Sequence, residues 1–172
     1  MRTPEPQPDW GPARSRTVQW WDPARTAAAA AGRSGLEFMQ DFADGKIPPP
    51  PIAMLFGMSL ARVERGLAQF ECVPDESAYN PIGAIHGGLI CTLLDSVTAC
   101  AIHSTLPQGK GYTSIEIKVN YLRAVRLTSG LLTATGTVVK AGSRVGFTEG
   151  VVTDPDGAVI ATATSTLLVF DL

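Results

Sequence analysis

The 172-residue chain has little of what crosslinks a protein or carries it across a membrane. Its three cysteines include no C-x-x-C pair, so a disulfide framework and a zinc knuckle are both disfavoured. No run of about 18 apolar residues could span a bilayer. The first 20 residues lack the apolar stretch of a signal peptide. These absences favour a cytoplasmic protein with buried thiols.

Charge is also scarce. Charged residues make up 17% of the chain, hydrophobic residues make up 45%, and the net charge is −2. Such a chain has no global basic field for nucleic acid. The apolar composition is sufficient for a sizeable core. The low charge indicates that a partner subunit covers part of the surface.

Prolines mark the N-terminal region. Residues 1–20 are rich in Pro, Arg and Gln and predict a loose tail. Its tryptophans are expected to dock on the domain or on a neighbouring subunit; they are Trp10, Trp20 and the adjacent Trp21. The four prolines at 48–51 predict a stiff spacer that ends any helix.

A short helix is expected between the tail and the prolines. Ala27–Ala31 is prone to form a helix. Ser34 can cap a second helical turn, with Glu37 three residues later as its capping-box partner. We therefore divide the chain into two parts: residues 1–51 are a tail, a short helix and a polyproline spacer, and residues 52–172 are the folded domain.

The second part has an α+β pattern. Residues 87–105 have helical length and are apolar on nearly all faces, as in a buried helix. Short turns separate the stretches that have strand character. Those stretches are residues 54–64, 66–73, 112–125, 131–140, 144–153 and 158–170. The pattern predicts an antiparallel meander packed on one buried helix.

Asp95 is a carboxylate in the middle of this helix, between Leu94 and Val97. An unpaired ionised carboxylate in a core costs several kcal/mol or shifts its pKa upward. Such a group therefore needs a partner or a chemical role. A hydrogen bond with Ser96, Thr98 or the backbone would satisfy Asp95 without catalysis, and this reading stays open for the residue taken alone.

His86, Gly87 and Gly88 open the helix. The first N–H groups of a helix lack intrahelical acceptors and carry partial positive charge, so they can form an oxyanion hole. In the alternative reading, the glycines only allow close packing and His86 is a cap. Cys91 and Cys100 have no basic neighbour in sequence, which disfavours a cysteine nucleophile.

The spacing of these groups indicates a dimer. Asp95 follows His86 by nine residues, which is about half a turn out of phase and about 13 Å along a helix axis. The two ends of the helix cannot act on one small group within one chain. A two-fold dimer with antiparallel helices would bring Asp95 of one chain near Gly87 of the other.

The motif resembles a known family. Asn80-x-x-Gly83-x-x-His86-Gly87-Gly88, followed by Leu93-Leu94-Asp95, is similar to the hallmark of hotdog-fold thioesterases of the phenylacetate-degradation (PaaI-like) type. Residues 113–123 resemble the strand that follows the helix in that family, and the resemblance covers about residues 52–170. It implies the hotdog fold, in which a curved antiparallel sheet wraps around a long central helix.

The resemblance also implies residue roles. Asp95 would be the catalytic general base or nucleophile, and the N–H of the partner's Gly87 would hold the thioester oxygen. Asn80 would orient the thioester or water, and His86 would support this loop. Ser114 matches a hydroxyl that helps to place the water.

Thr113 replaces Ser114 in that role if the strand register shifts by one residue, because alternate residues face opposite sides. Thr113, Ile115 and Ile117 are predicted on the face opposite Ser114 and Glu116. Gly88 is a further candidate for substrate binding. Basic residues are candidates for the CoA phosphates, with Arg123 and Arg144 foremost.

The implied activity is hydrolysis of acyl-CoA without a metal or redox cofactor, by a homodimer or a homotetramer built as a dimer of dimers. Two alternatives stay open. One is a non-catalytic acyl-CoA binding protein on the same fold, since fold does not fix function. The other is a hotdog dehydratase, which would have His-Phe-Pro-Gly where this chain has Ile85-His86-Gly87-Gly88. The identity of the acyl group also stays open.

Overall fold

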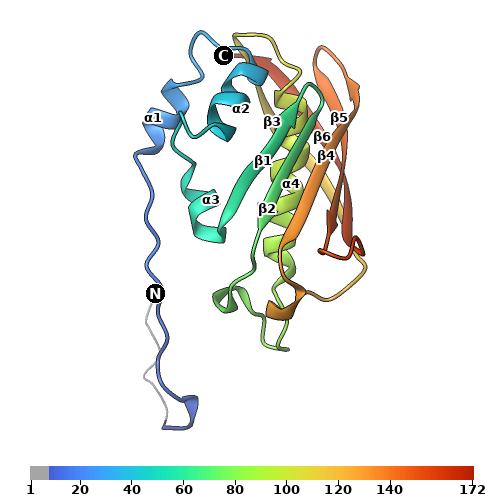
Figure 1. Cartoon of the computed structure of the whole chain (residues 1–172). Helices are drawn as coiled ribbons and strands as arrows, with labels where there is room; N and C mark the ends of the chain where they lie inside the picture. Colours follow the sequence, from blue (N-terminus) through green and yellow to red (C-terminus); the bar gives the residue numbers. More distant parts are fainter. Residues whose placement is uncertain (1–7) are drawn as a thin grey trace.

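The structure, a computed structural model, describes residues 8–172, so the first seven residues of the predicted tail lie outside the description. A long helix, α4 (Gly87–His103), packs against one face of a six-stranded antiparallel sheet (Figure 1). Three short helices lie on the N-terminal side of this unit. This arrangement is the expected hotdog fold, in which the sheet curves around the helix.

The remaining elements follow the chain in order. The N-terminal helices are α1 (Pro23–Ala28), α2 (Gly35–Ala43) and α3 (Pro51–Phe56). The strands are β1 (Met58–Glu64), β2 (Leu67–Cys72), β3 (Lys110–Tyr121), β4 (Leu132–Ala141), β5 (Val145–Thr153) and β6 (Val159–Asp171). Single 3₁₀ turns occur at Pro8–Trp10, Glu76–Ala78 and Leu127–Ser129.

The strand order is β1-β2-β4-β5-β6-β3. The predicted meander is right for β4, β5 and β6 but wrong for β3. This strand follows α4 in sequence yet pairs with β6 at the far edge of the sheet. The helix carries the chain across the sheet between β2 and β3, so the two strands are not neighbours. Within the described residues, β3 therefore has a strand on one side only.

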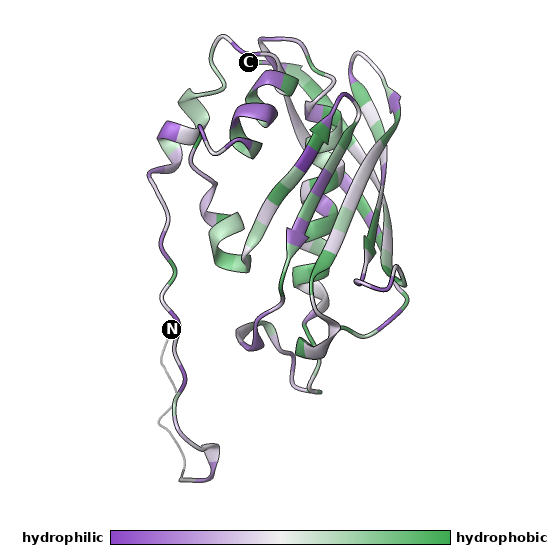
Figure 2. Cartoon of the chain, in the orientation of Figure 1, coloured by the Kyte–Doolittle hydropathy of each residue, from purple (hydrophilic) through white to green (hydrophobic). Residues whose placement is uncertain are grey.

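The core lies between α4 and the sheet. The fully buried side chains there include Leu93, Leu94 and Val97. Along the strands, hydrophobic and hydrophilic residues alternate (Figure 2). Gly136 of β4 faces Val97 so closely that a Cβ at position 136 would collide with the Val97 carbonyl. The absence of that Cβ sets how near the helix approaches the sheet.

The N-terminal helices confirm one prediction and correct another. The Ser34–Glu37 capping box is confirmed: the Ser34 backbone N–H donates to Glu37 at 2.8 Å. The strand predicted from residue 54 is wrong at its start, because α3 occupies that stretch and β1 begins at Met58. Pro51 begins α3 because the first helical position needs no N–H donor. Gly57, at φ 63°, ends it.

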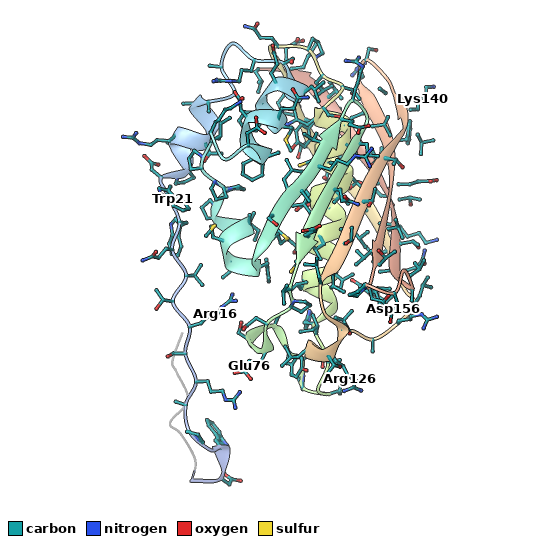
Figure 3. All side chains as sticks on the ribbon, in the orientation of Figure 1. Arg16, Trp21, Glu76, Arg126, Lys140 and Asp156 are labelled. Atoms are coloured by element: carbon teal, nitrogen blue, oxygen red, sulfur yellow. The ribbon has the colours of Figure 1, made fainter. Side chains whose placement is uncertain are left out.

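The tail does not cover the domain through Trp10 or Trp20, whereas Trp21 lines a cavity together with Met54 of α3. Trp10 and Trp20 are 57% and 60% exposed, so neither docks on its own chain. Ion pairs hold part of the tail instead: Arg14 pairs with Glu76, and Arg16 with Asp75. Figure 3 labels Arg16 on the tail and Glu76 on the domain. No helix of residues 8–172 has both the length and the apolarity to cross a membrane.

Candidate active site

Asp95 and Ser114 meet between α4 and β3. The Ser114 hydroxyl donates to Asp95 Oδ1 at 2.8 Å. The Thr98 hydroxyl donates to the carbonyls of Leu94 and Asp95 and not to the carboxylate. Thr98 therefore makes no hydrogen bond with the Asp95 carboxylate. The hydrogen bond to the carboxylate comes instead from Ser114 of β3.

A bulge in β3 explains why Ser114 reaches the helix. The pairing of β3 with β6 shifts register between Ser114 and Glu116, which leaves Ile115 as the extra residue. Ile115 is 56% exposed, whereas Ile117 packs against the core. The predicted alternation is thus wrong around Ile115, because Ser114 and Ile117 share the inner face. Thr113 is exposed, so Ser114 is the residue beside Asp95.

The predicted full burial of α4 is also wrong on one face. Asp95 is only half-buried in the single chain. Its neighbours on that face, Thr92 and Ser96, are likewise half-buried. The carboxylate is therefore reachable from outside the sheet-facing core. A substrate or a partner subunit could approach it from this side.

The N-terminus of α4 presents one free donor. His86 Nδ1 accepts the Gly88 N–H at 2.8 Å, so that N–H is used in the cap. The Leu89 N–H donates to the His86 carbonyl. For the Gly87 N–H, no acceptor lies within residues 8–172. Of the two predicted glycine donors, Gly87 is the one available to a ligand.

Tyr121 is a neighbour that sequence reasoning missed. Its hydroxyl donates to the Gly87 carbonyl at 3.1 Å. A Cβ on Gly87 would lie 3.1 Å from the Tyr121 ring. The available signal was an aromatic residue at the end of β3, in the strand that also supplies Ser114. Tyr121 thereby links the helix N-terminus to β3.

Asn80 organises the loop before α4. Its side-chain oxygen accepts the N–H groups of Ile82 and Ala84, each at 3.1 Å. Its backbone N–H donates to the Ala84 carbonyl at 2.8 Å. The oxygen of Asn80 is thus used within the loop, and its amide NH₂ is the group left to meet a substrate.

A cavity of about 640 Å³ extends from Asp95 and Ser114. Its walls include Phe38 of α2, His103 of α4 and Tyr112 of β3. The His103 ring lies 5.4 Å from Phe38 and 4.9 Å from Tyr112, centroid to centroid. Burial lowers the pKa of His103 to about 4, so this imidazole is neutral at pH 7.

The nearby thiols are poor nucleophiles. Burial, with a smaller effect of the Asp95 charge, raises the pKa of Cys100 to about 12. The same two causes raise the pKa of Cys91. Thiolates are the reactive form of cysteine. This supports the prediction that the carboxylate, and not a cysteine, is the reactive group.

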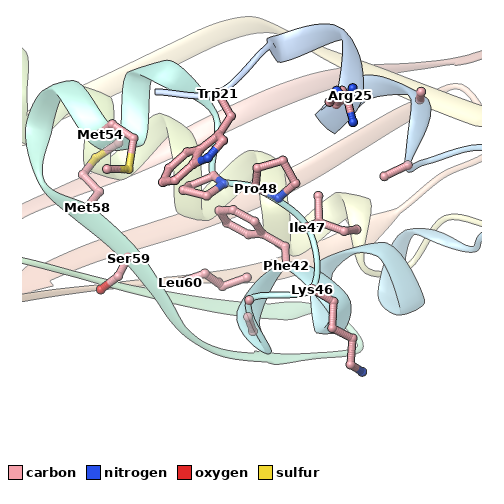
Figure 4. A pocket seen from close by; sticks show the side chains of 15 residues that line it. Trp21, Arg25, Phe42, Lys46, Ile47, Pro48, Met54, Met58, Ser59 and Leu60 are labelled. Carbon is pink, nitrogen blue, oxygen red and sulfur yellow. The ribbon is translucent and has the colours of Figure 1, made fainter. Parts of the chain in front are cut away.

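A second cavity, of about 1060 Å³, lies between the N-terminal helices and β1 (Figure 4). Trp21, Pro48 and Met54 line it, and Asp95 does not. We place the candidate active site in the smaller cavity, because only that one contains the carboxylate and its hydroxyl partner.

The two foremost basic candidates lie far apart. Arg123 follows β3, and its N–H donates to the Ile160 carbonyl near the start of α4. Arg144 precedes β5, and its carbonyl accepts the Val169 N–H. Val169 pairs with Tyr112 of β3, and the Tyr112 ring contacts His103 at the end of α4. Both side chains are exposed. The structure does not bring them together within one chain.

The same separation holds for the ends of the motif. Gly87 and Asp95 lie on one uninterrupted helix, so their backbones are about 12 Å apart along its axis. One chain therefore supplies a carboxylate with its hydroxyl partner at one place and a free backbone donor at another.

Comparisons with known proteins bear on the protein class and the fold. The model of the thioesterase superfamily matches residues 82–161, which include α4, β3 and Asp95. A candidate esterase of Halobacterium salinarum is 40% identical over 79 residues, covering 44% of this chain and 50% of that protein. Human acyl-coenzyme A thioesterase 13 is 29% identical over 91 residues, covering 53% and 64%. The chain spans about half the length of the first of these relatives.

A solved structure extends the similarity. The candidate thioesterase of Ralstonia eutropha JMP134, described as related to phenylacetic acid degradation, superposes with a TM-score of 0.69. It is 27% identical, and the match covers 76% of this chain and 98% of that one. Residues 82–161 thus match the thioesterase superfamily, and the chain has the hotdog fold of this solved structure.

Proposed function

We propose that this protein is an acyl-CoA thioesterase, which hydrolyses the thioester of a CoA-linked acyl or aryl-acyl group to free acid and CoA. The observation that carries the proposal is the 2.8 Å hydrogen bond from Ser114 to Asp95 at the wall of a largely apolar cavity. A carboxylate held in this way can bind and deprotonate water. The name of the human relative supports CoA thioesters as the substrate class.

The proposed reaction uses only groups of this chain and its copy. Asp95 takes a proton from water as the water oxygen attacks the thioester carbonyl carbon. The carbonyl oxygen becomes an oxyanion, which the N–H of the partner subunit's Gly87 stabilises. The C–S bond then breaks, and the sulfur of CoA leaves as a thiolate that takes up the proton. Asp95 as nucleophile would instead form a mixed anhydride that water hydrolyses.

The length of α4 supports a site that is shared between two chains. Asp95 and Gly87 are about 12 Å apart along the α4 axis, too far for one thioester carbonyl. A two-fold pairing with antiparallel α4 helices gives two equivalent sites. The half-buried face of α4 and the edge strand β3 are the surfaces we assign to this pairing.

The direct test is Asp95→Asn, which keeps the shape of the side chain and removes its basicity. We expect thiol release from acyl-CoA to fall by roughly 10²- to 10⁴-fold, the usual contribution of a general base. Asp156→Asn, in the exposed turn before β6, is the matched control and should leave turnover unchanged. Wild-type turnover in Asp95→Asn would contradict the proposed mechanism.

The same assay distinguishes the proposed function from a binding module, and a related assay distinguishes it from a dehydratase. A protein that binds acyl-CoA stoichiometrically, yet releases no thiol over hours, is a binding module and not an enzyme. Hydration of an enoyl-CoA, followed by loss of ultraviolet absorbance, would instead indicate a dehydratase.

A further inference from the structure

The N-terminal helices form one wall of the cavity that contains Asp95. Phe38, Met39 and Phe42 of α2 and Ile52 and Ala53 of α3 line it. The opposite wall belongs to α4 and β3, and α2 and α3 stand beside the sheet in Figure 1. The superfamily match begins only at residue 82, so this wall lies outside the matched region.

The wall is fixed to the domain. The Gly35 N–H, at the start of α2, donates to the Leu106 carbonyl at 3.0 Å. A Cβ on Gly35 would collide with the His103 carbonyl, so the two helices touch through their backbones. Met39 and Ala53 are 3% and 2% exposed and belong to the main core. The segment therefore has a set position over the cavity.

Residues 8–172 offer no free cation in this cavity to a charged acyl group. Among them, Asp95 and Lys110 are the only lining side chains that are charged at pH 7, since His103 is neutral. Lys110 pairs with Asp171 at 2.7 Å. A second carboxylate brought into this space would lose its hydration and face Asp95 without a counter-ion.

We infer that α2 and α3 are the specificity-determining wall of the acyl site, and that they restrict it to uncharged, apolar acyl groups whose length Phe38 limits. This inference rests on the proposed thioesterase function. Phe38 stands where it can set the depth of the cavity, because its ring packs on His103 two helical turns beyond Asp95. Truncating the ring would open space at that end.

The experiment compares Phe38→Ala with Gln40→Ala, an exposed position on the same helix that does not line the cavity. The probes are butanoyl-, octanoyl-, hexadecanoyl-, benzoyl- and succinyl-CoA, assayed by thiol release. We expect Phe38→Ala to shift the kcat/KM ratio of longer over shorter chains by about 10-fold or more, since each methylene in an apolar pocket is worth about that much. Gln40→Ala should leave the ratio unchanged, and succinyl-CoA should be the poorest substrate throughout.

A second variant tests the inference even if Phe38→Ala does not fold. Ile52 is 45% exposed and lines the same cavity, so Ile52→Trp narrows the space without disturbing the core. It should shift the preference toward butanoyl-CoA. If hydrolysis occurs but neither variant moves the chain-length profile, or if succinyl-CoA is preferred, the inference is wrong while the thioesterase function stands.

A binding measurement separates the two proposals. S-alkyl-CoA thioethers of the same chain lengths cannot be hydrolysed, and their affinity is measured by calorimetry. If no thioester is cleaved but Phe38→Ala still shifts affinity toward longer thioethers, the wall is confirmed and the catalytic proposal fails. If the thioethers show no dependence on chain length in any variant, the wall is rejected on this measurement too.

Discussion

At the scale of single residues, the candidate site contains a carboxylate and the hydroxyl that donates to it. Ser114 contacts Asp95 only because the bulge at Ile115 turns the strand residue inward. The carboxylate lies near the apolar wall that includes Tyr112, whose pKa is raised by burial and by the charges of Cys100 and Asp95. The Asp95 charge thus contributes to the raised pKa of a neighbouring side chain.

His103 gives a residue-scale prediction about pH. Its pKa falls from 6.5 to about 4 on folding because burial disfavours the charged ring. The unfolded chain therefore binds a proton that the folded chain does not, between these two pH values. Stability from this group is fully present above pH 6.5 and is lost as the pH falls toward 4.

The matched variant is His103→Phe, which keeps a ring between Phe38 and Tyr112. Urea unfolding from pH 7 to pH 4 should show a steeper loss of unfolding free energy in the wild type, by up to about 3 kcal/mol. Parallel curves for the two proteins would show that His103 is not buried as neutral imidazole.

At the scale of elements, much of the fold could be predicted from the sequence. Periodicity predicted α4 and all six strands, and the Ser34–Glu37 pair predicted the start of α2. The placement of β3 could not be predicted, because strand order depends on where the connecting helix crosses the sheet. The bulge at Ile115 was equally invisible, since apolar and polar residues alternate through it without interruption.

Only the residue identities of the candidate site could be proposed from the sequence. The identities of Asp95, Gly87 and Ser114 came from the motif, and their contacts needed the fold. The use of the Gly88 N–H by His86 depends on the cap geometry, which the glycine pair alone does not reveal. The cavity wall from α2 escaped prediction because Phe38 and Phe42 looked like an ordinary apolar helix face.

Close approach of α4 to the sheet gives a prediction at this scale. Gly136 and Gly150 face each other on β4 and β5 beneath the helix. A Cβ on Gly136 would meet the backbone of Val97, which cannot yield, so Gly136→Ala should cost about 3 kcal/mol of unfolding free energy. Gly150→Ala meets the side-chain methyl of Thr98 at 3.0 Å and should cost less.

Urea titration of both variants checks this ordering. The pair is a matched control for sheet propensity, because both replacements are Gly to Ala in neighbouring strands. An equal or larger loss in Gly150→Ala would mean that the helix does not rest on β4 as described.

At the scale of the whole molecule, the proposed site requires two chains. Gly87 lies at one end of α4 and Asp95 about two turns further along, while no strand of residues 8–172 pairs with the outer edge of β3. Exposed apolar side chains such as Ile115 lie on that edge strand. A two-fold pairing through β3 and the half-buried face of α4 would cover these surfaces and complete both sites.

Subunit complementation tests this claim most directly, using two variants that are each inactive alone. Asp95→Asn removes the carboxylate. Gly87→Pro removes the N–H at the first helical position, where proline is tolerated and where His86, at ψ 134°, already has the backbone that precedes proline. Gly87→Ala, which keeps the N–H, is the control for the added bulk beside Tyr121.

The two inactive variants are mixed, dissociated and reassembled, and thiol release from an acyl-CoA that the wild type cleaves is then measured. Each mixed dimer would pair an intact Asp95 with an intact Gly87 in one of its two sites, so activity should return to about a quarter of the wild-type level after random mixing. If mixed dimers form and no activity returns, the carboxylate and the backbone donor act within one chain, and the shared site is refuted.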